Sequence, residues 1–203
     1  MSSAVRLAAR LTAAVGAATL VLTLAACAPD PVTEQYREGS DKGFISREFQ
    51  VDEIPEDQRG EPVVWAGLTQ SGDELSSEDV AGDVVVVNFW YASCAPCRVE
   101  AADLEKVWQD YQDQDVSFVG VNTFDQADQA RSFAEKWGVT YPSLIDANDG
   151  SAKLAFASAT PIQATPVTLV LDREGRVAAR IIGRLESASI LSTLVGDTLK
   201  EKA

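Results

Sequence analysis

The hydrophobic pattern of the chain is clearest between residues 84 and 111. Residues 84–89 form an apolar run, which is typical of a strand buried on both faces. Apolar side chains then recur at the spacing of one helical face, at Cys97, Ala101, Leu104, Val107 or Trp108, and Tyr111. The pattern therefore predicts a buried strand that leads directly into an amphipathic helix, with the sequence Trp-Tyr-Ala-Ser-Cys-Ala-Pro-Cys at residues 90–97 between them.

Other apolar segments continue this alternation. Strands are expected at 44–51, 61–70, 116–122, 141–146, 167–172 and 177–182, the last two forming a hairpin. A turn is expected at Gly72 and again at 76–79. Helices are expected after the N-cap residues Asp125 and Ser187, with a weaker helix at 150–158. The helix after Asp125 would end at Gly138 and turn inward Ala130, Phe133 and Trp137. This order predicts an α/β fold with a mixed sheet flanked by helices.

Composition narrows the chemistry. The 203-residue chain has a formal net charge of −14, which argues against a nucleic-acid partner. It contains no histidine, so the ligands of a typical zinc site and the bases of Ser-His-Asp or Cys-His catalysis are missing. Covalent c-type haem requires a histidine after the second cysteine of its motif, where this chain has Arg98. We therefore expect no metal and no cofactor.

The N-terminal segment has the pattern of an export signal. Arg6 and Arg10 precede an apolar, alanine-rich stretch, and Leu-Ala-Ala-Cys follows at residues 24–27. This resembles a bacterial lipoprotein signal, which predicts removal of residues 1–26 and lipidation of Cys27. An ordinary signal peptide followed by an unrelated cysteine is the alternative. Residues 27–43 are polar with proline and glycine, as in a flexible tether, and residues 44–203 are expected to form the folded domain.

Cys94 and Cys97 lie at the predicted junction of strand and helix. Free N–H groups and the positive end of the helix dipole stabilise a thiolate at this position, and Pro96 suits the first turn. A Cys-x-x-Cys motif here indicates a dithiol that cycles with a disulfide. We expect Cys94 to be the exposed attacking thiol and Cys97 the buried resolving thiol. A purely structural disulfide is the alternative, but so small a loop would contribute little stability.

Several motifs together carry a family resemblance. Phe89-Trp90 precedes the Cys-Ala-Pro-Cys motif, Thr165-Pro166 opens a later strand, and the element order matches thioredoxin. Asn88, Glu100 and an additional helix and strand at 126–146 are similar to the membrane-tethered TlpA/ResA branch of extracytoplasmic thiol-disulfide oxidoreductases. The resemblance implies a thioredoxin-like fold with N-terminal strands and a central helix-strand insertion. Ser93 and Ala102 depart from the family, which usually has tryptophan and often proline at these positions.

The resemblance also implies roles for residues outside the motif. Pro166 would be preceded by a cis peptide bond, and the backbone of Thr165 would face the cysteines and pair with an extended substrate segment. Trp90 would line the substrate site, although a core position suits it equally well.

Glu100 lies three residues after Cys97, on or beside the inward helix face. Helical spacing alone leaves open whether this carboxylate is solvated or buried, and the resemblance favours burial. Burial would raise its pKa and let it exchange a proton with Cys97, a role made more plausible by Asn88, which stands where thioredoxin has a buried aspartate. Arg98 is expected to point into water.

The expected function is a lipid-anchored oxidoreductase on the extracytoplasmic face of the bacterial cell membrane. The resemblance implies reduction of disulfides in cysteine-containing secreted proteins, apocytochrome c among them, with electrons from a membrane thiol donor. Three alternatives remain open: an oxidant that introduces disulfides, a copper-delivery module that uses the two thiols, and a non-catalytic interaction domain. The absence of histidine weakens the copper alternative, and the presence of both cysteines weakens the non-catalytic one.

Overall fold

The computed structural model describes residues 49–201 except 158, 161 and 163. The predicted signal peptide, the tether and Cys27 lie outside the described residues. In the part of the chain that is described, no helix has both the length and the apolar character required to cross a membrane.

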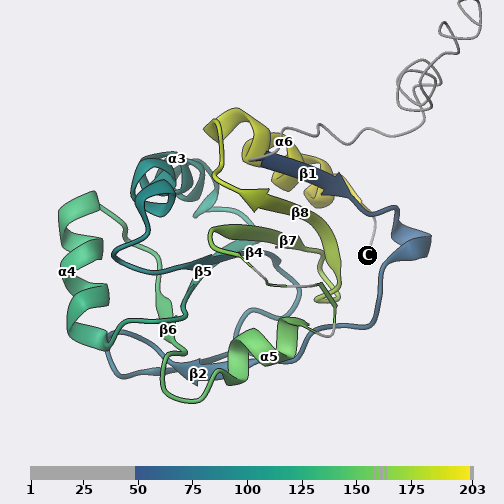
Figure 1. Cartoon of the computed structure of the whole chain (residues 1–203). Helices are drawn as coiled ribbons and strands as arrows, with labels where there is room; N and C mark the ends of the chain where they lie inside the picture. The colour runs from purple at the N-terminus through teal and green to yellow at the C-terminus, as the bar shows by residue number, and fades with distance from the viewer. Residues whose placement is uncertain (1–48, 158, 161, 163, 202–203) are drawn as a thin grey trace, which may run out of the picture. The chain divides into compact units, whose positions relative to one another are not determined.

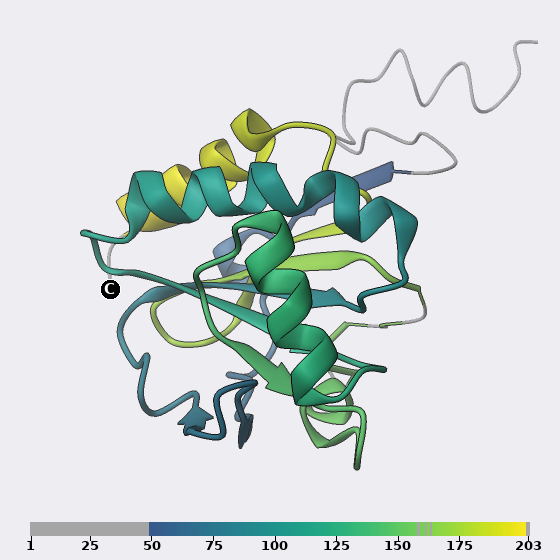
Figure 2. The same ribbon diagram turned by 90° about the vertical axis from the view of Figure 1, so that its left-hand side faces the viewer.

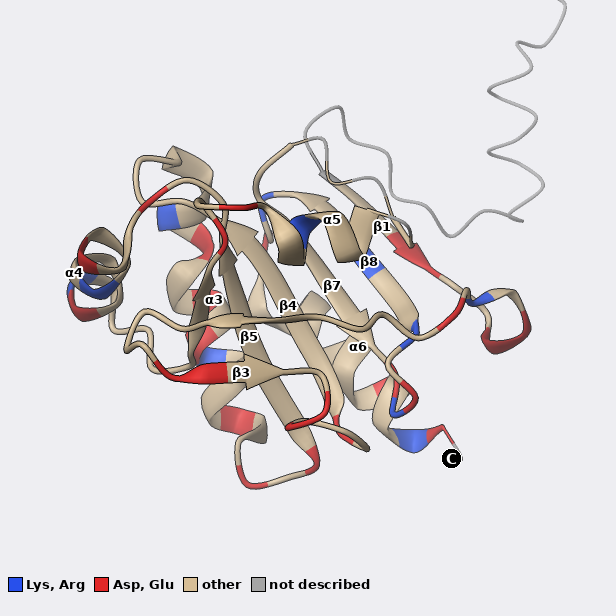
Figure 3. Ribbon diagram, turned by 90° about the horizontal axis from the view of Figure 1, so that it is seen from below, with Lys and Arg blue, Asp and Glu red and all other residues tan. Residues whose placement is uncertain are grey.

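A six-stranded mixed sheet forms the centre of the fold (Figure 1). Its order is β1 (Phe49–Glu53), β8 (Val177–Gly183), β7 (Val167–Leu171), β4 (Val84–Trp90), β5 (Val116–Asn122) and β6 (Ser143–Ile145). Strands β4, β5 and β6 run parallel to one another. Strand β7 is antiparallel to β4, β8 to β7, and β1 to β8. The central strands β4, β5 and β7 carry no charged residue, and acidic positions are spread over the helices, the turns and β3 (Figure 3).

Helices cover the sheet because each presents one apolar side. Helices α3 (Ala95–Tyr111) and α6 (Ala188–Lys200) lie together on one face (Figures 1 and 2). Leu104, Val107 and Leu191 pack there against Val84 and Val86 of β4. The other face packs against α5 (Ser151–Ala157) and the segment before β2 (Ala66–Leu68). Helix α4 (Ala127–Trp137) packs beside α3 near the end of β4.

The sheet, the flanking helices and the 177–182 hairpin strand agree with the sequence prediction, and the N-terminal region differs from it. Only three residues of the expected strand at 61–70 are in β2, which pairs with β3 (Glu74–Ser76) in a separate two-stranded sheet. Gly72 takes up a positive φ of 90° in the turn between them. A short 3-10 helix, η2 (Glu56–Gln58), follows β1.

Helix α4 also differs in one detail. Ala130 and Phe133 are buried as expected and Gly138 ends the helix with a φ of 73°, but Trp137 is 36% exposed. It is the last residue of the helix, and its ring packs on Phe133 with centroids 6.1 Å apart. The inward position predicted for Trp137 is therefore wrong.

Candidate active site

Cys94 and Cys97 form a disulfide at the start of α3, in the short turn that follows the end of β4 at Trp90. All seven residues of β4 are buried, so the position of the turn that follows is set by the sheet. Cys94 is the N-cap of α3, and the backbone N–H of Cys97 donates to Cys94 Sγ over 3.2 Å. In the reduced protein the same N–H and the helix dipole would stabilise a thiolate on Cys94.

Both cysteines are buried in the disulfide form. Cys94 and Cys97 are each 2% exposed, so the expectation of an exposed Cys94 is wrong for this state. Its sulfur is bonded to Cys97 on one side and lies 4.0 Å from the carbonyl oxygen of Thr165 on the other. Ser93 and Ala95, its neighbours in the chain, are exposed. The disulfide therefore lies just beneath the surface, covered by the segment that contains Thr165.

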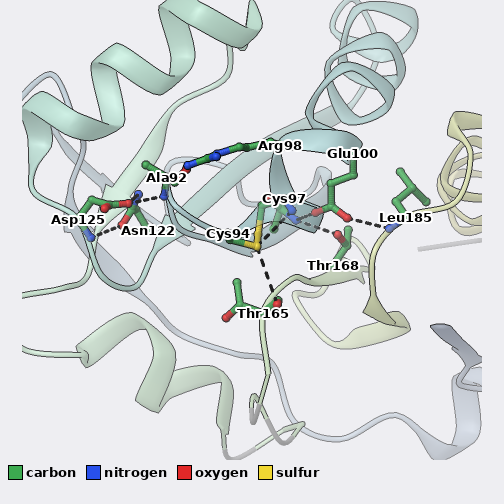
Figure 4. The surroundings of a disulfide bond; sticks show 11 residues. Ala92, Cys94, Cys97, Arg98, Glu100, Asn122, Asp125, Thr165, Thr168 and Leu185 are labelled. Atoms are coloured by element: carbon green, nitrogen blue, oxygen red, sulfur yellow. Dashed lines mark hydrogen bonds between the residues drawn. A yellow bond between two sulfur atoms is a disulfide. The ribbon is translucent and has the colours of Figure 1, made fainter. Parts of the chain in front are cut away.

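The segment that faces the disulfide leads into β7. The Thr165–Pro166 peptide bond is cis, as the resemblance implied. Pro166 is buried and Thr165 is partly exposed. Figure 4 shows the Thr165 carbonyl directed at Cys94 from the side opposite α3. A substrate chain that reaches Cys94 would thus pass next to the Thr165 backbone.

A pair of charged side chains holds the peptide groups of Ala92, two residues before Cys94 (Figure 4). The Ala92 N–H donates to Asp125 Oδ2 over 2.5 Å, and the Arg98 Nε–H donates to the Ala92 carbonyl over 2.8 Å. Asp125 was expected to cap α4, but the N-cap is Gln126 and the Asp125 carboxylate turns to the cysteine loop instead. Sequence reasoning missed this contact because Asp125 and Ala92 are 33 residues apart.

Arg98 is exposed at the surface, as expected. Its side chain also reaches back past the start of α3 to bind the carbonyl of Ala92. Both hydrogen-bonding groups of Ala92 are therefore occupied by charged partners, which fixes the backbone that leads to Cys94.

Trp90 packs in the core next to the two cysteines. It is 4% exposed, its ring lies 4.3 Å from that of Phe133, and its indole N–H donates to Ser143 Oγ over 3.2 Å. It belongs to the same buried cluster as Cys94 and Cys97. The structure therefore gives Trp90 a packing position beside the disulfide, and direct contact with a substrate stays a prediction.

Glu100 is fully buried behind the disulfide, on the same helix face as Cys97. Its Oε1 accepts from Asn88 Nδ2 over 3.0 Å and its Oε2 accepts from the Leu185 N–H over 2.7 Å (Figure 4). Asn88 also donates to Thr168 Oγ1 over 3.0 Å. Burial raises the pKa of Glu100 to about 7, and the two hydrogen bonds oppose this only in part. The predicted burial and raised pKa are confirmed, whereas proton exchange with Cys97 stays a prediction.

The arrangement brings together the Cys94–Cys97 disulfide, the backbone carbonyl of Thr165 and the buried carboxyl group of Glu100, whose pKa is raised. Among residues 49–201, as far as they are described, no group of three or more His, Cys, Asp or Glu side chains could hold a metal ion.

Residues 59–180 match the family model described as the AhpC/TSA family. Over 121 residues the chain is 33% identical to the thioredoxin-like protein YneN of Bacillus subtilis, covering 58% of this chain and 66% of YneN. It is 30% identical over 119 residues to the thiol-disulfide oxidoreductase ResA of Geobacillus thermodenitrificans, covering 59% and 66% of the two chains. The matched region thus spans just under two thirds of the length of these curated relatives.

The fold is similar to that of a secreted thiol-disulfide isomerase from Corynebacterium glutamicum. The TM-score is 0.65 and the sequence identity is 25%, with 74% of this chain and 92% of that chain covered. The predicted thioredoxin-like α/β fold is confirmed.

Proposed function

The chain belongs to the AhpC/TSA family, and from this premise we propose that it is a thiol-disulfide oxidoreductase that reduces disulfides in secreted proteins. The observation that carries the proposal is the Cys94–Cys97 disulfide at the N-terminus of α3, next to the carbonyl of Thr165. The relative named a thiol-disulfide oxidoreductase and the secreted isomerase with a similar fold support it.

The reaction begins with the reduced protein. The Cys94 thiolate attacks one sulfur of the substrate disulfide, forms a mixed disulfide and releases the other substrate sulfur as a thiolate. The substrate segment pairs with the backbone of Thr165, which lies beside Cys94 Sγ. Because Asp125 and Arg98 fix the peptide groups of Ala92, Cys94 meets the substrate from a rigid loop.

Cys97 then resolves the mixed disulfide. Its sulfur attacks Cys94 Sγ, closes the Cys94–Cys97 disulfide and releases the second substrate thiolate, so that two electrons have passed to the substrate. Cys97 must lose its proton to do this. Glu100 takes up that proton, because a carboxyl group with a pKa of about 7 is ionised in half of the molecules near neutral pH.

The buried carboxylate supports the reducing direction. Glu100 is buried on the same helix as Cys97, and a negative charge there would make a thiolate on Cys97 less favourable and thereby favour the disulfide (Figure 4). A protein whose disulfide is favoured gives up electrons readily. To act as a reductant in cells, the chain must be returned to the dithiol after each turnover, so we expect a membrane thiol donor to keep it largely reduced. A resting state that is almost fully oxidised, with disulfides missing from secreted proteins after deletion, would show that it is an oxidant instead.

We place this activity on the extracytoplasmic face of the cell membrane. The support is the lipoprotein-like sequence at residues 24–27, with residues 1–26 as signal peptide, Cys27 as the lipidated residue and 27–43 as the tether. Substrates would be exported proteins with cysteine pairs, including apocytochrome c. No nucleic acid is expected to take part, because of the strongly negative net charge.

Reduction of insulin by the full chain, with a thiol reductant as electron source, tests the activity. We expect turnover by the wild type and loss of turnover in Cys94→Ser, which keeps a side chain of similar size without the nucleophile. Equal rates for both proteins would refute the proposal.

Partners can be identified with Cys97→Ser, which cannot resolve the mixed disulfide and should accumulate substrates bound to Cys94. The double variant Cys94→Ser/Cys97→Ser serves as the control, because it keeps Cys27 and measures any background from that thiol. Recovery of the same proteins with both variants would show that capture does not depend on Cys94.

A further inference from the structure

Phe124 is an exposed aromatic residue beside the cysteine loop. Its side chain is 74% exposed, and its ring lies 5.9 Å from the ring of Tyr91, which is partly buried. Tyr91 immediately precedes Ala92 in the turn that leads to Cys94. The two rings therefore form an apolar surface close to the disulfide, and we call them the Tyr91–Phe124 pair.

Hydrogen bonds close the turn that carries Phe124 and tie it to the cysteine loop. Asn122 Oδ1 accepts from the N–H groups of Phe124 and Asp125 over 3.1 and 2.7 Å, and Asn122 Nδ2 donates to Asp125 Oδ2 over 3.0 Å. The same Asp125 oxygen accepts the Ala92 N–H (Figure 4). The backbone hydrogen bonds of this turn therefore position Phe124 beside the cysteine loop, while its ring stays exposed to solvent.

We propose that the Tyr91–Phe124 pair binds an apolar side chain next to the reactive cysteine of a substrate polypeptide. This inference rests on the proposed function and adds a substrate preference to it. A rigid exposed aromatic ring loses little conformational entropy on binding and gains most when an apolar group covers it. The pair adjoins the cysteine loop, because Tyr91 directly precedes Ala92 in the turn that leads to Cys94 and Phe124 directly precedes Asp125, which accepts the Ala92 N–H.

Ser93 strengthens this assignment. The residue directly before Cys94 is a small, exposed polar side chain and offers no apolar contact of its own. Phe124, in the turn after β5, offers the exposed aromatic surface that Ser93 lacks. The contact adds no step to the exchange reaction, in which two electrons pass from the dithiol to the substrate disulfide.

Two short peptides with one internal disulfide test the inference, one with leucine and one with serine beside each cysteine. The full chain, kept reduced by dithiothreitol, should show a higher kcat/KM for the leucine peptide. Phe124→Ser should lower kcat/KM for that peptide about tenfold, which corresponds to about 1.4 kcal/mol, and leave the serine peptide unchanged. Phe124→Leu, which keeps an apolar side chain, should retain most of the preference.

Val64→Ser is the matched control. Val64 is 76% exposed. Its neighbour Val63 donates a backbone hydrogen bond to Gly175 in the β7–β8 hairpin, which lies at the opposite end of β7 from Pro166. We expect this variant to behave as the wild type with both peptides.

Three outcomes would overturn the inference. Equal kcat/KM of the wild type for both peptides, or an equal fall for both in Phe124→Ser, would refute the substrate preference while leaving the proposed function intact. Failure of the wild type to reduce either peptide would refute the proposed function and remove the premise of the inference with it.

Discussion

Replacement of Glu100 by glutamine should change how the stability of the protein depends on pH. Burial raises the pKa of Glu100 from 4.5 to about 7, so the folded protein holds a proton that the unfolded chain releases within this window. Stability therefore falls as the pH rises from 4.5 to about 7, because the native state binds more protons there. Below this pH range Glu100 is protonated in both the folded and the unfolded state, so it does not lower the free energy of unfolding through its ionisation.

The magnitude follows from the width of the window. Each pH unit between 4.5 and about 7 costs about 1.4 kcal/mol, which sums to a loss of about 3 kcal/mol in the free energy of unfolding. Glutamine has nearly the same shape, can still accept one of the hydrogen bonds from Asn88 and the Leu185 N–H, and does not titrate. The variant should be free of this pH-dependent loss.

Guanidinium unfolding of the oxidised wild type and of Glu100→Gln, at a series of pH values from below 4.5 to above 7, measures the difference directly. Other titrating groups are common to both proteins and cancel in the comparison. The variant should gain about 3 kcal/mol relative to the wild type across the window. Glu135→Gln, an exposed glutamate on α4, should run parallel to the wild type.

A constant difference between wild type and Glu100→Gln over the whole pH range would refute the reasoning. It would mean that the hydrogen bonds from Asn88 and the Leu185 N–H compensate the burial of the charge, so that Glu100 has the same pKa in the folded and in the unfolded chain.

Three further predictions concern the reaction and its location. Glu100→Gln should shift the pH profile of thiol reactivity and slow the resolution of mixed disulfides by Cys97 in stopped-flow experiments; unchanged profiles and rates would leave Glu100 without a role in proton transfer. Asp125→Ala should lower the free energy of unfolding by about 1–2 kcal/mol, because the Ala92 N–H loses a charged acceptor, and an unchanged denaturation midpoint would contradict this. Cys27→Ser should release the protein from membranes or leave the precursor unprocessed, whereas unaltered lipid labelling and membrane fractionation would rule out Cys27 as the anchor.

Local pattern was sufficient to predict the centre of this protein. The apolar run that became β4 and the helical spacing of Cys97, Ala101 and Leu104 are properties of neighbouring residues, so the strand, the helix and the cysteines between them could be found in the sequence. The Cys-x-x-Cys spacing likewise identified a possible disulfide, because two cysteines three residues apart at a helix start lie at a distance that a disulfide can bridge. The cis bond before Pro166 came from the family resemblance and not from the local pattern.

The tertiary structure alone decided which partners surround these residues. Glu100 is buried because its oxygens meet Asn88, 12 residues away, and the Leu185 N–H, 85 residues away. Asp125 accepts the Ala92 N–H instead of capping α4, and Cys94 is covered by Thr165, 71 residues distant. Each of these contacts depends on the order of strands in the sheet, which brings β7 next to β4 and the turn after β5 next to the cysteine loop. Hydrophobic periodicity records which side of an element is buried, but it holds no information about which distant element covers that side.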